Sequence, residues 1–150
     1  MHMAALQAPG LQFPWHAWVL GALFALFGLA SGFDHVMSLA QGASYYRASG
    51  MTEQQVAHFT AVPFWAVLAW SASVWAGLMG AVALLVRRRA AWVLFAVSVA
   101  GSLGYIAYSF LLSAGREAMG VLWPMPFVVT ALTAGMAFYC WRLGRKGVLR

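Results

Sequence analysis

The chain has 150 residues, of which 63% are hydrophobic and only 8% are charged. A soluble domain carries about 25% charged residues, so this composition excludes a soluble globular protein and requires apolar surface to face lipid. The formal net charge is +6, which in a soluble protein would indicate nucleic-acid binding. Here the basic residues lie at the ends of apolar segments, as in membrane proteins, and we expect no nucleic-acid partner.

Four apolar segments are each long enough to cross a bilayer, which requires about 20 helical residues. The first lacks a basic start and is too long for a secretory signal, so we expect it to be retained. We predict an all-α, polytopic membrane protein in which residues 1–150 form a single bundle of four transmembrane helices. The predicted spans are about residues 15–39, 61–86, 91–112 and 122–141.

The polar connection between the first two spans predicts a short amphipathic helix. Thr52 and Gln55 have the spacing of a capping box, which favours a helix over residues 53–60. Val56 and Phe59 lie three residues apart on it, and we expect them to rest on the membrane.

The basic residues predict the orientation of the chain. An even number of spans places both termini on one side, together with seven basic residues, and leaves only two on the other side. The positive-inside rule then predicts cytoplasmic termini. The seven are Arg87, Arg88, Arg89, Arg142, Arg145, Lys146 and Arg150; the two are Arg47 and Arg116. The three acidic residues, Asp34, Glu53 and Glu117, fall on the outer side.

Most tryptophans support these span limits, because they lie at the predicted membrane interfaces. Trp70 and Trp75 are exceptions, since both lie well inside the second span.

Small residues recur every fourth position in three spans, a pattern typical of close helix packing in membranes. We therefore expect these residues to lie at helix contacts. They are Gly28 and Gly32 in the first span, Ser73, Gly77 and Ala81 in the second, and Ala131 and Gly135 in the fourth.

Two spans also carry polar faces. Ser98, Ser102, Tyr105 and Ser109 fall in one stripe of the third span, and Ser31, Asp34, His35 and Ser38 share a face of the first. We expect these two faces to pack together as a polar seam that widens towards the outer side.

Asp34 is the leading candidate for a charged functional group, because an ionisable residue inside a membrane segment is costly. The alternative is a structural carboxylate that pairs with Arg47 or Arg116 and fixes the outer loop. A histidine beside a carboxylate is also consistent with a proton-linked switch. A second possibility is a metal site formed by His35, His58 and the nearby acidic residues. No metal-binding spacing joins them, and we expect no metal.

The sequence indicates neither a cofactor nor catalysis. A b-type haem needs two histidines at matching depth, whereas His16 lies near the inner end of its span and His35 near the outer end. No nucleophile motif, phosphate-binding glycine loop or catalytic carboxylate pair is present. We therefore expect that the protein is not an enzyme.

Aromatic residues of the outer side suggest a ligand platform. Rings flanked by hydrogen-bonding side chains suit sugars and quinone head groups, and the alternative is an interfacial aromatic cluster. Together with the polar seam, they define our candidate ligand contacts. These are Asp34, His35, Tyr45, Tyr46, Arg47, Gln55, His58, Trp65, Tyr105 and Arg116.

Most of residues 15–113 resembles a group of small four-span proteobacterial inner-membrane proteins, some of which are described as sugar transporters. The resemblance lies in FDHVMS (33–38), Tyr45, QQVAHF (54–59), PFWA (63–66), WSASVWAG (70–77) and the 84–88 end of the second span. Relatives often have FDYVM at 33–37, which favours Asp34 over His35 as the required group. The resemblance implies fold and location, and brings no mechanism or binding residue with it.

Three functions are compatible with these features. The first is a transporter-like protein that binds or moves a small polar or amphipathic solute from the outer face, as a homo-oligomer in membrane lipid. The second is a non-catalytic accessory subunit of a larger membrane complex. The third, a small multidrug exporter, is disfavoured because the first span has no acid before Asp34 and the charge bias opposes dual topology.

Overall fold

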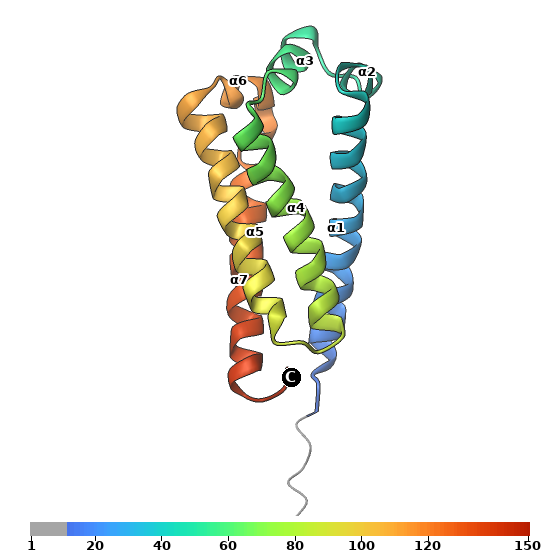
Figure 1. Cartoon of the computed structure of the whole chain (residues 1–150), viewed down its shortest axis with the longest axis vertical. Helices are drawn as coiled ribbons and strands as arrows, with labels where there is room; N and C mark the ends of the chain where they lie inside the picture. Colours follow the sequence, from blue (N-terminus) through green and yellow to red (C-terminus); the bar gives the residue numbers. More distant parts are fainter. Residues whose placement is uncertain (1–11) are drawn as a thin grey trace, which may run out of the picture.

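The computed structural model describes residues 12–150, and in it four long helices run side by side (Figure 1). Each is long and apolar enough to cross a membrane, so the chain is an integral membrane protein and the predicted all-α four-helix bundle is confirmed. The long helices are α1 (Trp15–Gln41), α4 (Phe64–Leu85), α5 (Ala90–Ala107), which continues as the π-helical turn η1 (Tyr108–Leu112), and α7 (Met125–Arg145).

Four short elements lie at one end of the bundle, which we call the capped end (Figure 1). The predicted helix after Thr52 is present with its capping box, whereas the other three elements were not predicted. They are α2 (Ala43–Ala48), α3 (Glu53–Thr60), α6 (Gly115–Met119) and the 3-10 turn η2 (Gly120–Leu122). Because η2 occupies residues 120–122, the last span begins at Met125 and not at residue 122.

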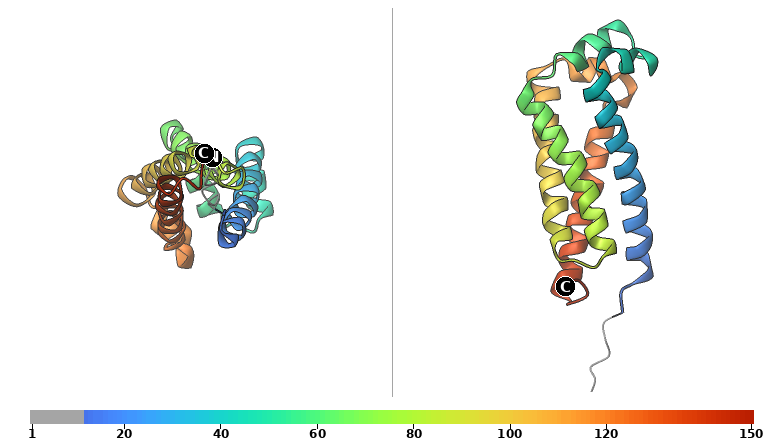
Figure 2. Two further views of the ribbon diagram at one scale, coloured as in Figure 1. Left: turned by 90° about the horizontal axis from the view of Figure 1, so that it is seen from below. Right: turned by 45° about the vertical axis from the view of Figure 1, so that its right-hand side comes forward.

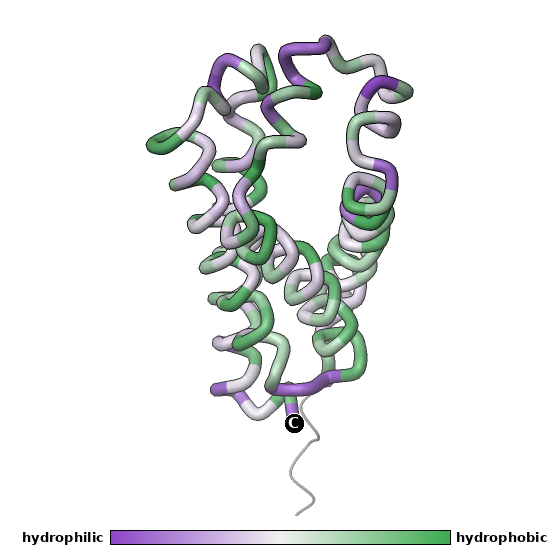
Figure 3. Tube along the Cα trace, turned by 45° about the horizontal axis from the view of Figure 1, so that its top comes forward, coloured by the Kyte–Doolittle hydropathy of each residue, from purple (hydrophilic) through white to green (hydrophobic). Residues whose placement is uncertain are grey.

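The opposite end, which we call the basic end, carries the turn 87–89 and the end of α7. Figure 3 shows hydrophilic segments at both ends and a largely apolar middle, as expected where a bilayer has two polar surfaces. Arg87 has a left-handed φ of 59°. The amides of Arg87 and Arg88 donate to the carbonyls of Leu84 and Ala83, which satisfies the end of α4.

The residues after α7 fold back onto the basic end and do not extend away from it as a free tail. The amide of Arg150 donates to the carbonyl of Arg87 (2.8 Å), and the amide of Arg89 donates to the carbonyl of Arg150 (2.7 Å). Leu149 is fully buried between these bonds. This contact links the turn between α4 and α5 to the end of α7.

The long helices form an arc in the order α1, α4, α5, α7, with α4 packed on both α1 and α5 and α5 packed on α7 (Figure 2). The expectation that the first and third spans pack directly on each other is therefore wrong, because α4 packs between their backbones. Their polar faces nevertheless line one cavity, to which α1 contributes Ser31 and Asp34 and α5 contributes Ser98, Ser102 and Tyr105. In lipid, helices pack where small residues permit close approach, and α4 has small residues on both sides.

The small-residue pattern predicts the contacts of α1 and α4 but not those of α7. Gly28 of α1 faces Leu78 of α4, and Gly77 of α4 faces Ser98 of α5. A Cβ atom added at either glycine would lie 3.0 Å from the facing side chain. Ala131 and Gly135 are exposed, and nothing lies within 4 Å of a Cβ built at Gly135. Their predicted role in bundle packing is wrong, since this face of α7 points away from the other helices.

The closest backbone approach joins α4 and α5 at Gly101. A Cβ there would lie 2.5 Å from the carbonyl oxygen of Ala69 and 2.7 Å from the amide nitrogen of Ser73. We expect Gly101→Ala to reduce the free energy of unfolding by about 1–3 kcal/mol, because backbone atoms cannot move aside as a flexible side chain can. Unfolding in mixed micelles measures this. Gly135→Ala is the matched control, with an expected change within about 0.5 kcal/mol, and equal effects of the two variants would contradict the prediction.

Candidate functional site

Two adjoining cavities lie inside the arc, and they meet at Asp34 of α1, Trp70 of α4 and Tyr105 of α5. The first has a volume of about 470 Å³ and lies among the four long helices. The second, of about 400 Å³, extends to the capped end. These three side chains therefore form a stretch of wall that the two cavities share.

Most of the first cavity's wall is apolar, with a few hydroxyl groups distributed over all four helices. The aromatic part comes from Phe24 and Phe27 of α1 together with Trp70 and Tyr105. Such a wall suits a ligand that is apolar over most of its surface and polar at one end. The hydroxyl-bearing residues besides Tyr105 are Ser31, Ser73, Ser98, Ser102 and Thr133.

Asp34 is an exposed side chain that is held by the loop after its own helix. Gly42 turns the chain with a φ of 52°, and α2 then brings the hydroxyl of Tyr45 to donate to Oδ1 of Asp34 at 2.8 Å. This bond raises the pKa of Tyr45, because the carboxylate favours the protonated phenol. The other carboxylate oxygen has no protein donor in the described part of the chain.

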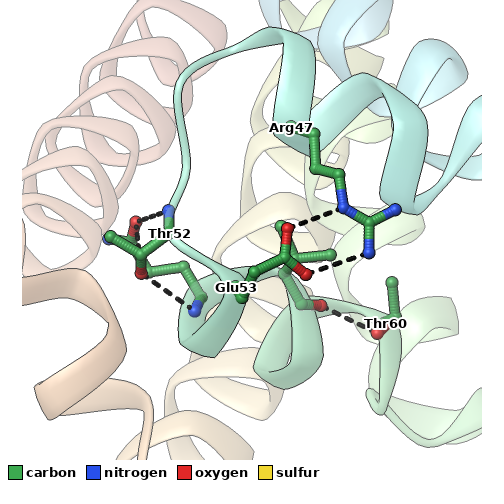
Figure 4. A network of polar contacts seen from close by, with 6 residues as sticks. Arg47, Thr52, Glu53 and Thr60 are labelled. Atoms are coloured by element: carbon green, nitrogen blue, oxygen red, sulfur yellow. Dashed lines mark hydrogen bonds and ion pairs between the residues drawn. The ribbon is translucent and has the colours of Figure 1, made fainter.

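Neither arginine that was considered as a partner for Asp34 contacts it. Arg47 instead binds Glu53, with Nε and Nη2 lying 2.8 Å and 3.0 Å from the two carboxylate oxygens (Figure 4). This pair lowers the pKa of Glu53 and raises that of Arg47. Arg116 lies over the ring of Trp123, 5.0 Å from its centroid. Asp34 therefore lines the cavities without either arginine as an ion-pair partner.

His35 lies beside Asp34 in sequence but points into the contact between α1 and α4. It is buried, its Nε2 lies 3.1 Å from the hydroxyl of Ser71, and its ring meets the Trp70 ring edge-on at 4.4 Å between centroids. On its other side, Trp70 lies 6.0 Å from the Tyr105 ring. His35 is thus placed to position Trp70 in the cavity wall and does not line the cavity itself.

The helix α3 closes the capped end and uses its polar residues for structure. The side-chain amide of Gln55 donates to the carbonyl of Ala118 at 2.8 Å and accepts from the amide of Thr52, so it joins α3 to α6. Val56 is buried and Phe59 packs on Tyr46 at 5.8 Å. The expectation that Val56 and Phe59 rest on the membrane is wrong, because they pack on the protein itself.

The structure brings only some of the candidate ligand contacts together. Asp34, Tyr46 and Tyr105 line the cavities, and Tyr45 reaches them through Asp34. Trp65 is exposed and packs edge-on against Tyr108 at 5.7 Å. The remaining candidates, His35, Arg47, Gln55, His58, Trp65 and Arg116, do not line either cavity.

The residue that sequence reasoning missed is Trp70. Its position deep in the second span does not fit an interfacial aromatic belt. This exception is the sequence feature that indicates a role inside the bundle. The two histidines raised as metal ligands do not converge, because His35 lies in the α1–α4 contact and His58 in α3. Among residues 12–150, no three histidine, cysteine or acidic side chains lie close enough together to hold a metal ion.

Comparisons with protein families, curated proteins and solved structures find no match to this chain. The resemblance to small four-span inner-membrane proteins therefore stays a prediction.

The burial of His58 in α3 makes the stability of the protein depend on pH. Burial lowers its pKa, and its Nε2 is buried without a hydrogen-bond partner. Because the unfolded chain binds a proton at His58 below about pH 6.5 more readily than the folded chain, stability falls as the pH drops through that value. We expect the melting temperature to fall between about pH 7.5 and 5.5, and to fall less in His58→Gln. An identical pH profile for the variant would contradict this assignment.

Proposed function

We propose that the protein is a non-catalytic, transporter-like protein of the bacterial inner membrane that binds a small amphipathic solute from the outer face. The observation that supports this is the meeting of the two cavities at Asp34, Trp70 and Tyr105. A volume of about 470 Å³ falls in the range of small-molecule sites, which is about 300–1,000 Å³.

The chemistry of the wall indicates the class of solute. The free oxygen of Asp34 accepts a hydrogen bond from a hydroxyl or amine, and the scattered serine and threonine hydroxyls offer further partners. The Trp70 and Tyr105 rings supply flat apolar surface for the rest of the ligand. A sugar fits this pattern, because one face of its ring is apolar and its edge carries hydroxyls.

The orientation in this proposal follows from charge. The basic end faces the cytoplasm with both termini, so the capped end and Asp34 face the outside. The arc leaves α1 and α7 as its two edges, and one chain does not enclose a complete pathway. The proposal therefore includes a second copy, or a partner subunit, beside this open side.

We expect Asp34→Asn to abolish ligand-dependent stabilisation. A solute present at 100 times its dissociation constant adds about 2.7 kcal/mol to the stability of the native state, which thermal melting of the purified protein detects. The panel consists of sugars, quinones, amino acids and divalent ions. Glu117→Gln is the matched control, because this outer carboxylate does not line either cavity.

A ligand whose stabilising effect survives Asp34→Asn, or is lost equally in Glu117→Gln, would contradict the binding site. Transport is tested separately, by uptake of the stabilising solute into proteoliposomes. Binding without uptake above that of protein-free vesicles would remove transport from the proposal and leave a binding protein.

An accessory subunit is the second candidate, favoured by the exposed small-residue face of α7. Ala131 and Gly135 are exposed, and among the described residues nothing lies within 4 Å of a Cβ built at Gly135. Such a face permits close approach of another helix. We expect Gly135→Leu to remove a partner that co-purifies in mild detergent, because the larger side chain blocks that approach. Ala100→Leu, on an exposed position of α5, is the control. A wild-type protein that purifies alone would exclude this candidate.

A further inference from the structure

A third cavity, of about 380 Å³, lies at the basic end between the start of α1 and the end of α7. It plays no part in the solute site. Its polar lining comes from Gln12, His16, Tyr139, Arg142 and Lys146. Two full positive charges therefore face one small cavity, close to Trp15 at the start of α1 and to Arg145 at the end of α7.

These charges have no acidic partner nearby. All three acidic side chains of the chain belong to α1 near its outer end, to α3 or to α6. Within residues 12–150, the side chains of Arg142 and Lys146 make no ion pair, and Arg142 only lies over the Phe138 ring at 5.9 Å. Such an arrangement attracts an anion from outside the chain.

The basic side chains are not needed to cap α7. The amides of Gly147 and Val148 donate to the carbonyls of Gly144 and Leu143 at 3.1 Å and 3.0 Å, which satisfies these carbonyls through the backbone. The N–H groups of Arg142 and Lys146 therefore remain available to a ligand.

The start of α1 adds two further features that favour an anion. The hydroxyl of Tyr139 lies 2.6 Å from Nδ1 of His16. When Tyr139 donates this bond, the imidazole proton is on Nε2 and can be donated to a ligand. The 27-residue helix α1 also begins without a side-chain cap and without an acidic residue in its first turn, so its N-terminal partial charge is not neutralised.

We infer that this cavity binds a phosphate group, and that the phosphate belongs to an anionic phospholipid. Arginine and lysine together suit phosphate oxygens, and basic pockets between transmembrane helices bind anionic headgroups. An apolar groove of about 200 Å³ lies between α1 and α7, lined by Leu23, Phe24, Phe27, Val129 and Leu132. Leu23 is seven residues above His16, roughly 10 Å along the helix, which is within reach of an acyl chain from a headgroup at the cavity.

The test is thermal melting of the full chain in zwitterionic detergent micelles, titrated separately with phosphatidylglycerol, with phosphatidylcholine and with inorganic phosphate. We expect phosphatidylglycerol to raise the melting temperature and phosphatidylcholine to have little effect. The double variant Arg142→Gln/Lys146→Gln should weaken the apparent affinity for phosphatidylglycerol about tenfold or more. The double variant Arg88→Gln/Arg145→Gln removes the same charge from the same end, outside the cavity, and should retain the wild-type affinity.

Each outcome decides the inference. If inorganic phosphate stabilises the protein and Arg142→Gln/Lys146→Gln abolishes this effect, the phosphate site is supported. The ligand is then free phosphate and not a lipid headgroup. Equal weakening by both double variants overturns the site, because it shows only diffuse surface charge, and so does the absence of any response to either anion. If the first double variant does not fold, His16→Gln keeps both charges and should still weaken phosphatidylglycerol binding; an unchanged affinity would overturn the inference.

Discussion

The close approach of α4 and α5 is the contact on which the rest of the bundle depends. Helices in lipid gain little from burying apolar surface, so their association relies on van der Waals packing and hydrogen bonds. At Gly101 the two backbones meet without an intervening side chain, and the Ser98 hydroxyl donates to the carbonyl of Ser73 at 2.6 Å across the same interface. This contact places Trp70 of α4 and Tyr105 of α5 side by side in the cavity wall.

The position of Asp34 depends on a second set of interactions, at the capped end. The Thr52–Gln55 capping box starts α3, Gln55 joins α3 to α6, and the Arg47–Glu53 pair joins α2 to α3. With α2 held in this way, Tyr45 reaches Asp34. Several polar residues that the sequence suggests as ligand contacts are therefore structural. They hold the carboxylate of Asp34 where the two cavities meet.

The sites at the two ends follow from one architectural property, the open side of the arc between α1 and α7. Towards the capped end, the two cavities that meet at Asp34 lie inside this arc. At the basic end the His16–Tyr139 contact joins α1 and α7 beside the cationic cavity. A lipid or a second chain on this side would contact both α1 and α7, because the apolar groove there is lined by residues of both helices.

The sequence by itself determined the membrane location, the four spans, the capping box of α3 and the concentration of basic residues at one end. All of these depend on local composition and on spacing within one segment, and so they can be derived without knowing which segments touch. Only the tertiary structure decided that α4 lies between α1 and α5, that Trp70 completes the cavity wall, and that His35 points away from Asp34. Helix order depends on pairwise packing between segments distant in sequence, and a one-residue step rotates a side chain by about 100°, which is enough to separate a cavity-facing aspartate from a buried histidine beside it.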